Sequence, residues 1–262
     1  MILRRIIAHV RKQEWTAIAI DFLIVVVGVF IGIQVSNWNT ARSERQRGIE
    51  LAERLTSDLR TEAWFLSNFE EYYDDVRDNA ERALAVLEGR ASASDQALLV
   101  SAYRATQYVS ALRARSTYDE IISTGAIGLI SDQALRETAN LVYTTPLFDN
   151  IAREGIASPY RERFRMIISS DTQAALAATC GDRFVVVGDY EGIVDSLDYA
   201  CETGLPAADL HAAVRALRSD ATLVPLLRLR ISDIGTRLSD VQNLGVRVPR
   251  ARQTLRELQS PL

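Results

Sequence analysis

The hydrophobic pattern of the chain begins with an uninterrupted apolar stretch, Thr16–Val35, which reads TAIAIDFLIVVVGVFIGIQV. A helix of about 20 such residues spans ~30 Å, which is the hydrocarbon thickness of a bilayer. Trp15 and Trp38 flank the stretch, as tryptophans often do at the two membrane–water interfaces. The pattern therefore predicts a transmembrane helix over residues 15–38.

A secretory signal peptide is the competing interpretation, because the preceding residues MILRRIIAHVRK are basic. The apolar stretch is longer than the ~7–15 residues of a signal-peptide core, and no A-x-A cleavage site follows it. We therefore expect an uncleaved anchor. Residues 2–13 have apolar positions at helical spacing, so they form either an amphipathic surface helix or simply a basic flank that sets topology.

Beyond the anchor, apolar residues recur every three or four positions, and this rhythm predicts one long amphipathic helix over residues 49–88. We expect it to continue from the anchor without a linker and to stop at Gly89. Its apolar positions are Ala52, Leu55, Leu59, Ala63, Leu66, Phe69, Tyr73, Val76, Ala80, Ala83 and Leu87. Tyr72 and Tyr73 together are predicted to be half core and half surface.

Shorter helices follow, and start and stop residues mark their ends. Ser92 or Ser94 caps one helix, Thr117 with Glu120 forms a capping box for the next, and Ser131-Asp132 starts a third. The predicted ranges are 95–113, 118–124, 132–144, 146–168 with a break at 155–159, 207–218, 221–243 and 251–259.

Residues 169–205 are less regular, with a strand-like run at 184–187 and a short helix predicted at 190–199. The only two cysteines, Cys180 and Cys201, flank this region. Their number and spacing favour a disulfide in an oxidising compartment, against two buried free thiols. The expected fold class is mainly α, with a transmembrane helix continuing into an all-α periplasmic bundle over residues 39–262.

Charge is unevenly distributed along a chain whose net charge is −4. Residues 1–14 are basic and the remainder is acidic, which argues against a nucleic-acid partner. The basic flank predicts that the N-terminus lies in the cytoplasm, as a tail of residues 1–14 that is too short for an output domain. The expected location is thus a bacterial inner membrane, crossed once.

Asp21 is the most informative residue of the predicted span, because a charge within a bilayer costs ~2.5–3.5 kcal/mol on insertion scales. At ~100° per residue, Gly28 and Gly32 return to within about 20° of the Asp21 side, and together they form a GxxxG pattern. This side predicts association with a membrane protein or a second copy. The alternatives are chance glycines, a hydrated or protonated Asp21 without a partner, and a proton-carrying Asp21.

Catalytic patterns are poorly represented. The two histidines, His9 and His211, are far apart in the sequence, and no nucleophile-elbow, Walker or dinucleotide motif is present. We expect no cofactor and no metal. The acidic pairs Glu70-Glu71 and Asp74-Asp75 are interpreted as a solvated helix face rather than a cation site, and residues 123–128 as a turn rather than an anion site.

Two stretches of the chain resemble a widespread family of uncharacterised bacterial single-span membrane proteins. They are EWTAIAIDFLIVVVGVFIGIQVSNWNTAR, residues 14–42, and STYDEIISTGAIGLISDQALRETANLVY, residues 116–143. The resemblance implies a membrane location and a helical C-terminal region, with no activity or catalytic residue.

These observations favour a membrane-anchored, non-enzymatic interaction or sensor-like module. An accessory subunit of a membrane complex, docked through Asp21, Gly28 and Gly32, is one alternative. A periplasmic ligand-binding bundle is another, and an enzyme is a third.

Overall fold

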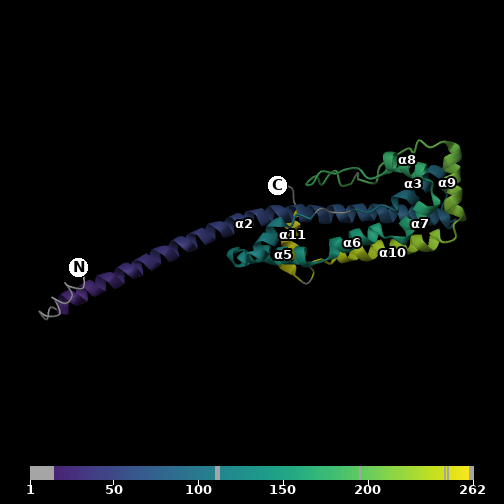
Figure 1. Ribbon diagram of the computed structural model, residues 1–262. Coiled ribbons are helices and arrows are strands. Elements are labelled where there is room, and N and C mark those ends of the chain that lie inside the picture. The colour runs from purple at the N-terminus through teal and green to yellow at the C-terminus, as the bar shows by residue number, and fades with distance from the viewer. Residues whose placement is uncertain (1–14, 110–112, 195, 245, 247, 260–262) are drawn as a thin grey trace.

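The computed structural model describes residues 15–109, 113–194, 196–244, 246 and 248–259, and over these residues the chain is mainly helical. The predicted cytoplasmic tail and the amphipathic segment 2–13 lie outside the described residues. Figure 1 shows one long helix, α2, that projects from a bundle of shorter ones. The helices are α2 (Trp15–Leu87), α3 (Asp95–Arg104), α4 (Ser116–Ser123), the 3₁₀ helix η1 (Ala126–Leu129), α5 (Gln133–Thr144), α6 (Leu147–Ile156), α7 (Pro159–Ile167), α8 (Ser170–Cys180), α9 (Ala207–Ser219), α10 (Leu223–Gln242) and α11 (Pro249–Gln259).

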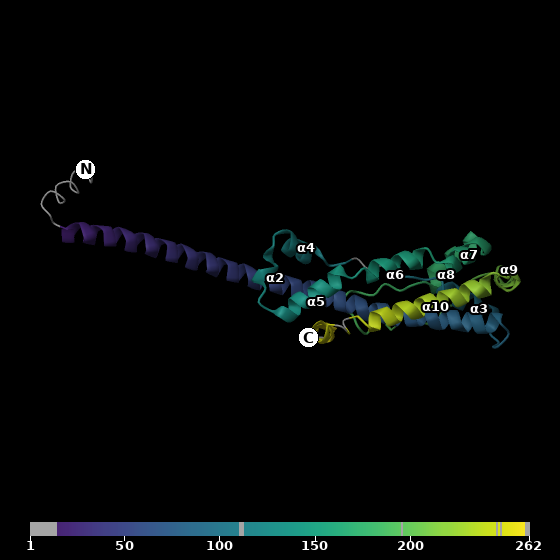
Figure 2. The same ribbon diagram turned by 90° about the horizontal axis from the view of Figure 1, so that it is seen from below.

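Helix α2 is the central element of the bundle, and its buried positions begin at Gly48 and end at Val86. Two hydrophobic clusters share it. The first surrounds Leu51–Val76 and draws on α4, η1, α5, α6, α11 and the end of α10. The second surrounds Ala80–Val86 and draws on α3, α7, α8, α9 and the start of α10. Figure 2 shows α10 running back beside α2, so it contributes to both clusters.

Several predicted helix ends are confirmed by their capping contacts. The side chain of Ser94 accepts a hydrogen bond from the backbone of Ala97 at the start of α3, and Asp132 does the same from Leu135 at the start of α5. Gly89 adopts a left-handed φ of 72° just after α2, which a residue with a side chain rarely adopts. The predicted break near Gly155 separates α6 from α7, where Ser158 caps and Pro159 begins the next helix.

Other expectations are wrong. Helix α3 ends at Arg104 rather than near residue 113. The capping box does not form, because Thr117 lies inside the first turn of α4 and its backbone N–H donates to Asp58. The side chain of Glu120 instead pairs with Arg54 across to α2, so a tertiary contact replaces the local one.

The region predicted to be irregular also differs from expectation. Ser170–Cys180 forms the regular helix α8, capped by Ser169. The run 184–187 forms no strand and ends in a turn that begins at Val187, and the described residues of 190–199 form turns and bends rather than a helix. Tyr72 and Tyr73 are both buried, because the segment after α8 covers one side of α2 and α10 covers another.

Gly48 is the first residue of α2 that is buried by the bundle. A Cβ at this position would collide with the carbonyl oxygen of Leu129 at the end of η1, so the two backbones touch directly. We expect Gly48→Ala to lower the free energy of unfolding by about 1–3 kcal/mol, as overpacking does. Thermal unfolding of the full chain in detergent, followed by circular dichroism, measures it. Gly235→Ala in α10 is the matched control, because a Cβ there meets no atom within 4 Å; an equal loss in both variants contradicts the contact.

Candidate functional site

The N-terminal part of α2 is not covered by the rest of the described chain. All side chains from Phe22 to Arg47 are exposed, although many of them are large and apolar. Within the described residues, α2 is the only helix long and apolar enough to cross a membrane. Exposed Ile, Val and Phe side chains along a whole helix are unfavourable in water, so this part needs another apolar environment.

Asp21, Gly28 and Gly32 share one side of α2. The helix is continuous through all three residues, and a Cβ at either glycine would meet open space. At ~100° per residue, the three positions lie about 160–200° around the helix from Gly48. The side that carries them is therefore opposite to the side on which η1 packs.

A buried ion pair fixes the segment before α4 onto α2. Glu62 is 0% exposed and accepts from Arg113 Nε at 2.6 Å and from the backbone N–H of Ala114 at 2.8 Å. The guanidinium also donates to the carbonyl of Val142 in α5 and lies over the Phe148 ring. Burial raises the pKa of Glu62, and Arg113 opposes that rise. Sequence reasoning missed this pair, because Glu62 and Arg113 are far apart along the chain.

Two buried arginines join distant segments through backbone carbonyls. Arg104 donates to the carbonyls of Cys180 and Tyr199, and Arg230 donates to those of Ala105 and Gln107 beyond the end of α3. These carbonyl oxygens accept no hydrogen bond from a helix backbone. Without the guanidinium groups they would be buried and unpaired. The arrangement is structural, and it holds the segment after α8 and helix α10 against α3.

The disulfide loop, which we define as residues 181–206, folds back along α2 (Figure 1). Cys180 and Cys201, the predicted pair, are bonded, with their Cα atoms 5.4 Å apart. Farther along the loop, Trp64 Nε1 in α2 donates to the carbonyl of Asp189 at 3.1 Å. The outer edge of the loop leaves Phe184 92% and Val186 63% exposed.

Carboxylates gather where the disulfide loop crosses α2. Desolvation raises the pKa of Asp75 to about 7, and the nearby charges of Asp198, Glu71 and Asp78 add to the rise, while Arg82 opposes it. The loop therefore partly covers the acidic side that was interpreted as solvated. In the described residues, no group of three or more His, Cys, Asp or Glu side chains is placed to hold a metal ion.

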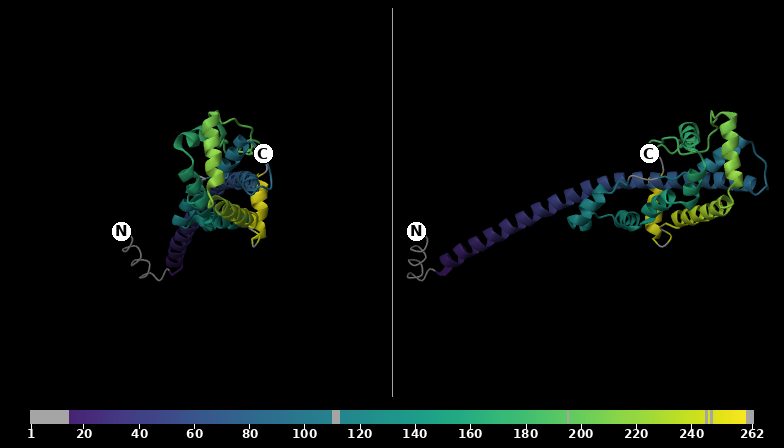
Figure 3. Two further views of the ribbon diagram at one scale, coloured as in Figure 1. Left: turned by 90° about the vertical axis from the view of Figure 1, so that its right-hand side faces the viewer. Right: turned by 45° about the vertical axis from the view of Figure 1, so that its right-hand side comes forward.

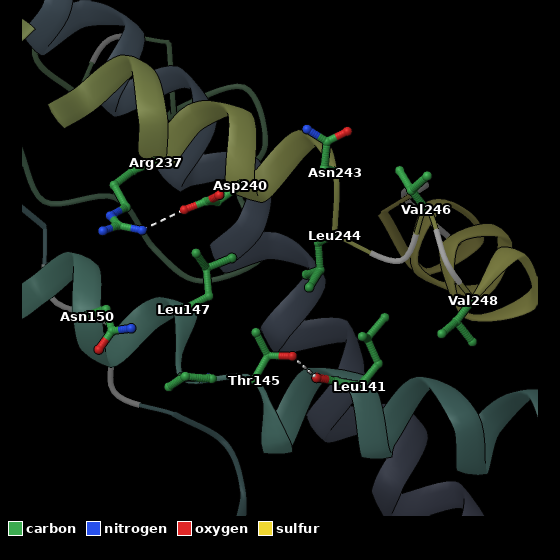
Figure 4. A pocket seen from close by; sticks show the side chains of 11 residues that line it. Leu141, Thr145, Leu147, Asn150, Arg237, Asp240, Asn243, Leu244, Val246 and Val248 are labelled. Carbon is green, nitrogen blue, oxygen red and sulfur yellow. Dashed lines mark hydrogen bonds and ion pairs between the residues drawn. The ribbon is translucent and has the colours of Figure 1, made fainter. Parts of the chain in front are cut away.

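A pocket of about 580 Å³ lies between α5, α6 and the end of α10 (Figure 4). Its floor is apolar, with Leu141, Leu147 and Leu244, and polar groups stand at its rim. Arg237 on the rim is bound to Glu154 at 2.7 Å and to Asp240 at 2.6 Å, so its charge is neutralised within the chain. The pocket can thus take an apolar group, and its rim offers no free charge from Arg237.

His211 in α9 pairs with an acidic side chain at the start of α3. Its Nδ1 lies 2.7 Å from the carboxylate of Asp95, and both side chains are accessible to solvent. In the segment considered for anion binding, the hydroxyls of Ser123 and Thr124 bond to the carbonyl of Glu120. These contacts favour the turn interpretation.

Comparison with known proteins found no matching family model, no similar curated protein and no similar solved structure. The functional argument therefore rests on the residues of this chain. The resemblance at residues 14–42 and 116–143 stays a prediction.

The pKa of Asp75 makes stability depend on pH. The folded chain keeps this proton up to about pH 7, whereas the unfolded chain loses it near 3.8, so stability falls as pH rises between these values. We expect Asp75→Asn, which stays neutral, to gain over the wild type across that range and to level off above it. One pKa unit is about 1.4 kcal/mol and solvent screens part of the shift, so the gain at pH 8 is about 1–3 kcal/mol. Denaturation at pH 4–8 measures it.

Glu81→Gln is the control for this experiment, since Glu81 is exposed on the same stretch of α2 and is not one of the charges that raise the pKa of Asp75. A gain for Asp75→Asn that is the same at every pH, or an equal gain in the control, contradicts a buried proton at Asp75.

The disulfide loop should depend on its covalent closure. Replacing both Cys180 and Cys201 by serine removes a cross-link between residues 21 apart, so we expect a loss of about 3 kcal/mol in the loop-entropy description. Unfolding midpoints of the oxidised wild type and the double variant, with and without reductant, measure it. The wild type should fall to the level of the variant only when reduced. An unchanged midpoint would mean that the contacts of Arg104 and Trp64 hold the loop alone.

Proposed function

We propose that the chain is a single-span protein of a bacterial inner membrane, with its N-terminus in the cytoplasm and its bundle in the periplasm. We further propose that it works by association with membrane proteins rather than by catalysis. One observation carries the proposal: a single helix contains both an uncovered apolar stretch and the central positions of the bundle core. An anchor built in this way fixes the position of the bundle relative to the bilayer.

The orientation is supported by charge and by redox chemistry. Arg4, Arg5, Arg11 and Lys12 precede the span, as basic residues do on the cytoplasmic side, although Arg42, Arg45 and Arg47 follow it. The bonded pair Cys180–Cys201 suits an oxidising compartment such as the periplasm. Both lines favour residues 39–262 as the periplasmic domain.

The association surface is the side of α2 that carries Asp21, Gly28 and Gly32. Glycines let a second helix backbone approach closely, and dispersion contacts over that short distance stabilise helix pairs in lipid. An intramembrane carboxyl is costly unless another polar group meets it, so a hydrogen-bonding group of the partner should lie opposite Asp21. No atom of the described chain competes for this surface, since the glycines face open space.

The test is purification from native membranes in mild detergent, with mass spectrometry of the accompanying proteins. We expect the wild type to carry a stoichiometric membrane partner, or a second copy, and Asp21→Leu to lose it at least tenfold because the polar contact is gone. Ala19→Leu is the matched control, since Ala19 lies on the other side of the helix, about 160° from Asp21. The same complement of proteins together with the same mass of the purified complex, measured by light scattering, in all three samples contradicts the proposal.

The pocket beside α10 supports a second function, binding of a small apolar molecule in the periplasm. Apolar pockets of this size with a polar rim are common ligand sites. A small molecule that co-purifies with the wild type, stays bound in Asp21→Leu and is lost in Leu147→Asp favours this function over the first.

A further inference from the structure

We infer that a second copy of this chain packs against the side of α2 that carries Asp21, Gly28 and Gly32, and that the contact continues outside the membrane to the two disulfide loops. The inference rests on the proposed membrane anchoring and names the partner of the same surface. It predicts a parallel pair related by a two-fold axis that runs along the apolar part of α2.

The surface continues beyond the apolar stretch because α2 does not break. Gln46, Glu50 and Ser57 lie about 160–200° from Gly48, as Asp21, Gly28 and Gly32 do, and all three are exposed. The bundle elements α5, α6 and α10 lie on the other side of α2 (Figure 1), so they do not obstruct a second helix. A partner that follows the glycines can therefore follow α2 out of the bilayer.

The disulfide loop lies on this same side. Trp64 holds the loop through the carbonyl of Asp189. Trp64 and Gly32 lie at equal sequence distances from Gly48, Trp64 after it and Gly32 before it. Both positions are thus about 160° from the side on which η1 packs. Figure 3 shows that α2 is curved, and Figure 1 shows its convex side toward the loop. Because of this bend, the bundle leans away from a two-fold axis that runs along the apolar part of α2. The space between the two bundles can therefore hold both disulfide loops.

The exposed edge of the loop indicates a protein partner and not the bilayer. Phe184 and Val186 are 92% and 63% exposed, and Val187 beside them is 49% exposed. The loop contacts α2 at Trp64, which lies ~40 Å along the helix from Trp38 at ~1.5 Å per residue, so lipid cannot cover it. About a two-fold axis, each loop would cover the apolar edge of the other.

Charges between the membrane and the loop suit two identical surfaces. Arg42, Glu53 and Arg60 lie on one flank of the exposed side, and Arg47, Glu50 and Arg54 lie on the other or near the centre. Glu50 lies near the centre, so the second flank carries only Arg47 and Arg54. Glu53 on the first flank and Arg54 on the second, which also pairs with Glu120, lie at nearly the same height. An isologous pair can place acidic groups of one copy beside basic groups of the other, as self-complementary interfaces require.

Photo-crosslinking in intact cells that express the full chain tests the inference. A photoreactive benzoylphenylalanine replaces Phe184 in one sample, Val25 on the Asp21 side of the span in a second, and Leu229 in a third. Leu229 is 46% exposed on α10, on the far side of α2, and is the control. We expect adducts of twice the chain mass, containing only peptides of this chain, from the Phe184 and Val25 samples, at no less than tenfold the yield of the control.

The outcomes separate the two proposals. If the Val25 sample crosslinks to any membrane protein while the Phe184 sample gives no adduct with a second copy, the proposed function stands and the two-loop contact is wrong. A Phe184 adduct with a different protein also overturns the second copy as partner. If neither position gives an adduct above the control, the inference fails, and the co-purification of Asp21→Leu decides the proposed function separately.

Discussion

The whole structure depends on the hydrogen bonding of one helix. In α2 every interior backbone group is satisfied within the helix, so the same element can lie in hydrocarbon along one part and in a water-soluble core along another. The part of α2 that the bundle covers begins at Gly48, where the backbone carbonyl of Leu129 lies directly against the helix. Everything that folds on α2 lies beyond this point.

The bundle is held on α2 by a few long-range polar contacts as well as by its two apolar clusters. Glu62 with Arg113 positions the segment before α4, and the buried Arg104 and Arg230 bind carbonyls that would otherwise be unpaired. Truncating a partner of such a contact leaves a buried charge or carbonyl unsatisfied, which costs more than the contact contributes. These groups make the arrangement of the short helices specific.

Much of the fold could be predicted from the sequence, because its signals are local. The apolar stretch, the long heptad-like rhythm and the capping residues Ser94 and Asp132 predicted most of the helices, although α3 ends well before residue 113 and α8 was not predicted. Two of the failures have one physical cause. Thr117 and Glu120 bond to α2 instead of to each other, and the run 184–187 is held by the disulfide and by Trp64 rather than by strand pairing. Contacts between residues far apart in sequence decide both, and no local pattern reports them.

The proposed association surface follows from the sequence alone, since Asp21, Gly28 and Gly32 are related by helical spacing. That the surface lies opposite Gly48 and on the side of the disulfide loop required the structure.

The central claim is that the apolar part and the bundle part of α2 form one stiff helix when the apolar part is in a bilayer. The direct test is a spin-label distance between Gln34→Cys and Ser57→Cys in lipid nanodiscs, with labelled protein diluted in unlabelled protein. Both positions are exposed, and the native cysteines are bonded to each other and do not react. A continuous helix predicts a narrow distribution of backbone separation near ~35 Å. A broad distribution, or one centred well below this value, means that α2 hinges at the membrane surface and contradicts the account.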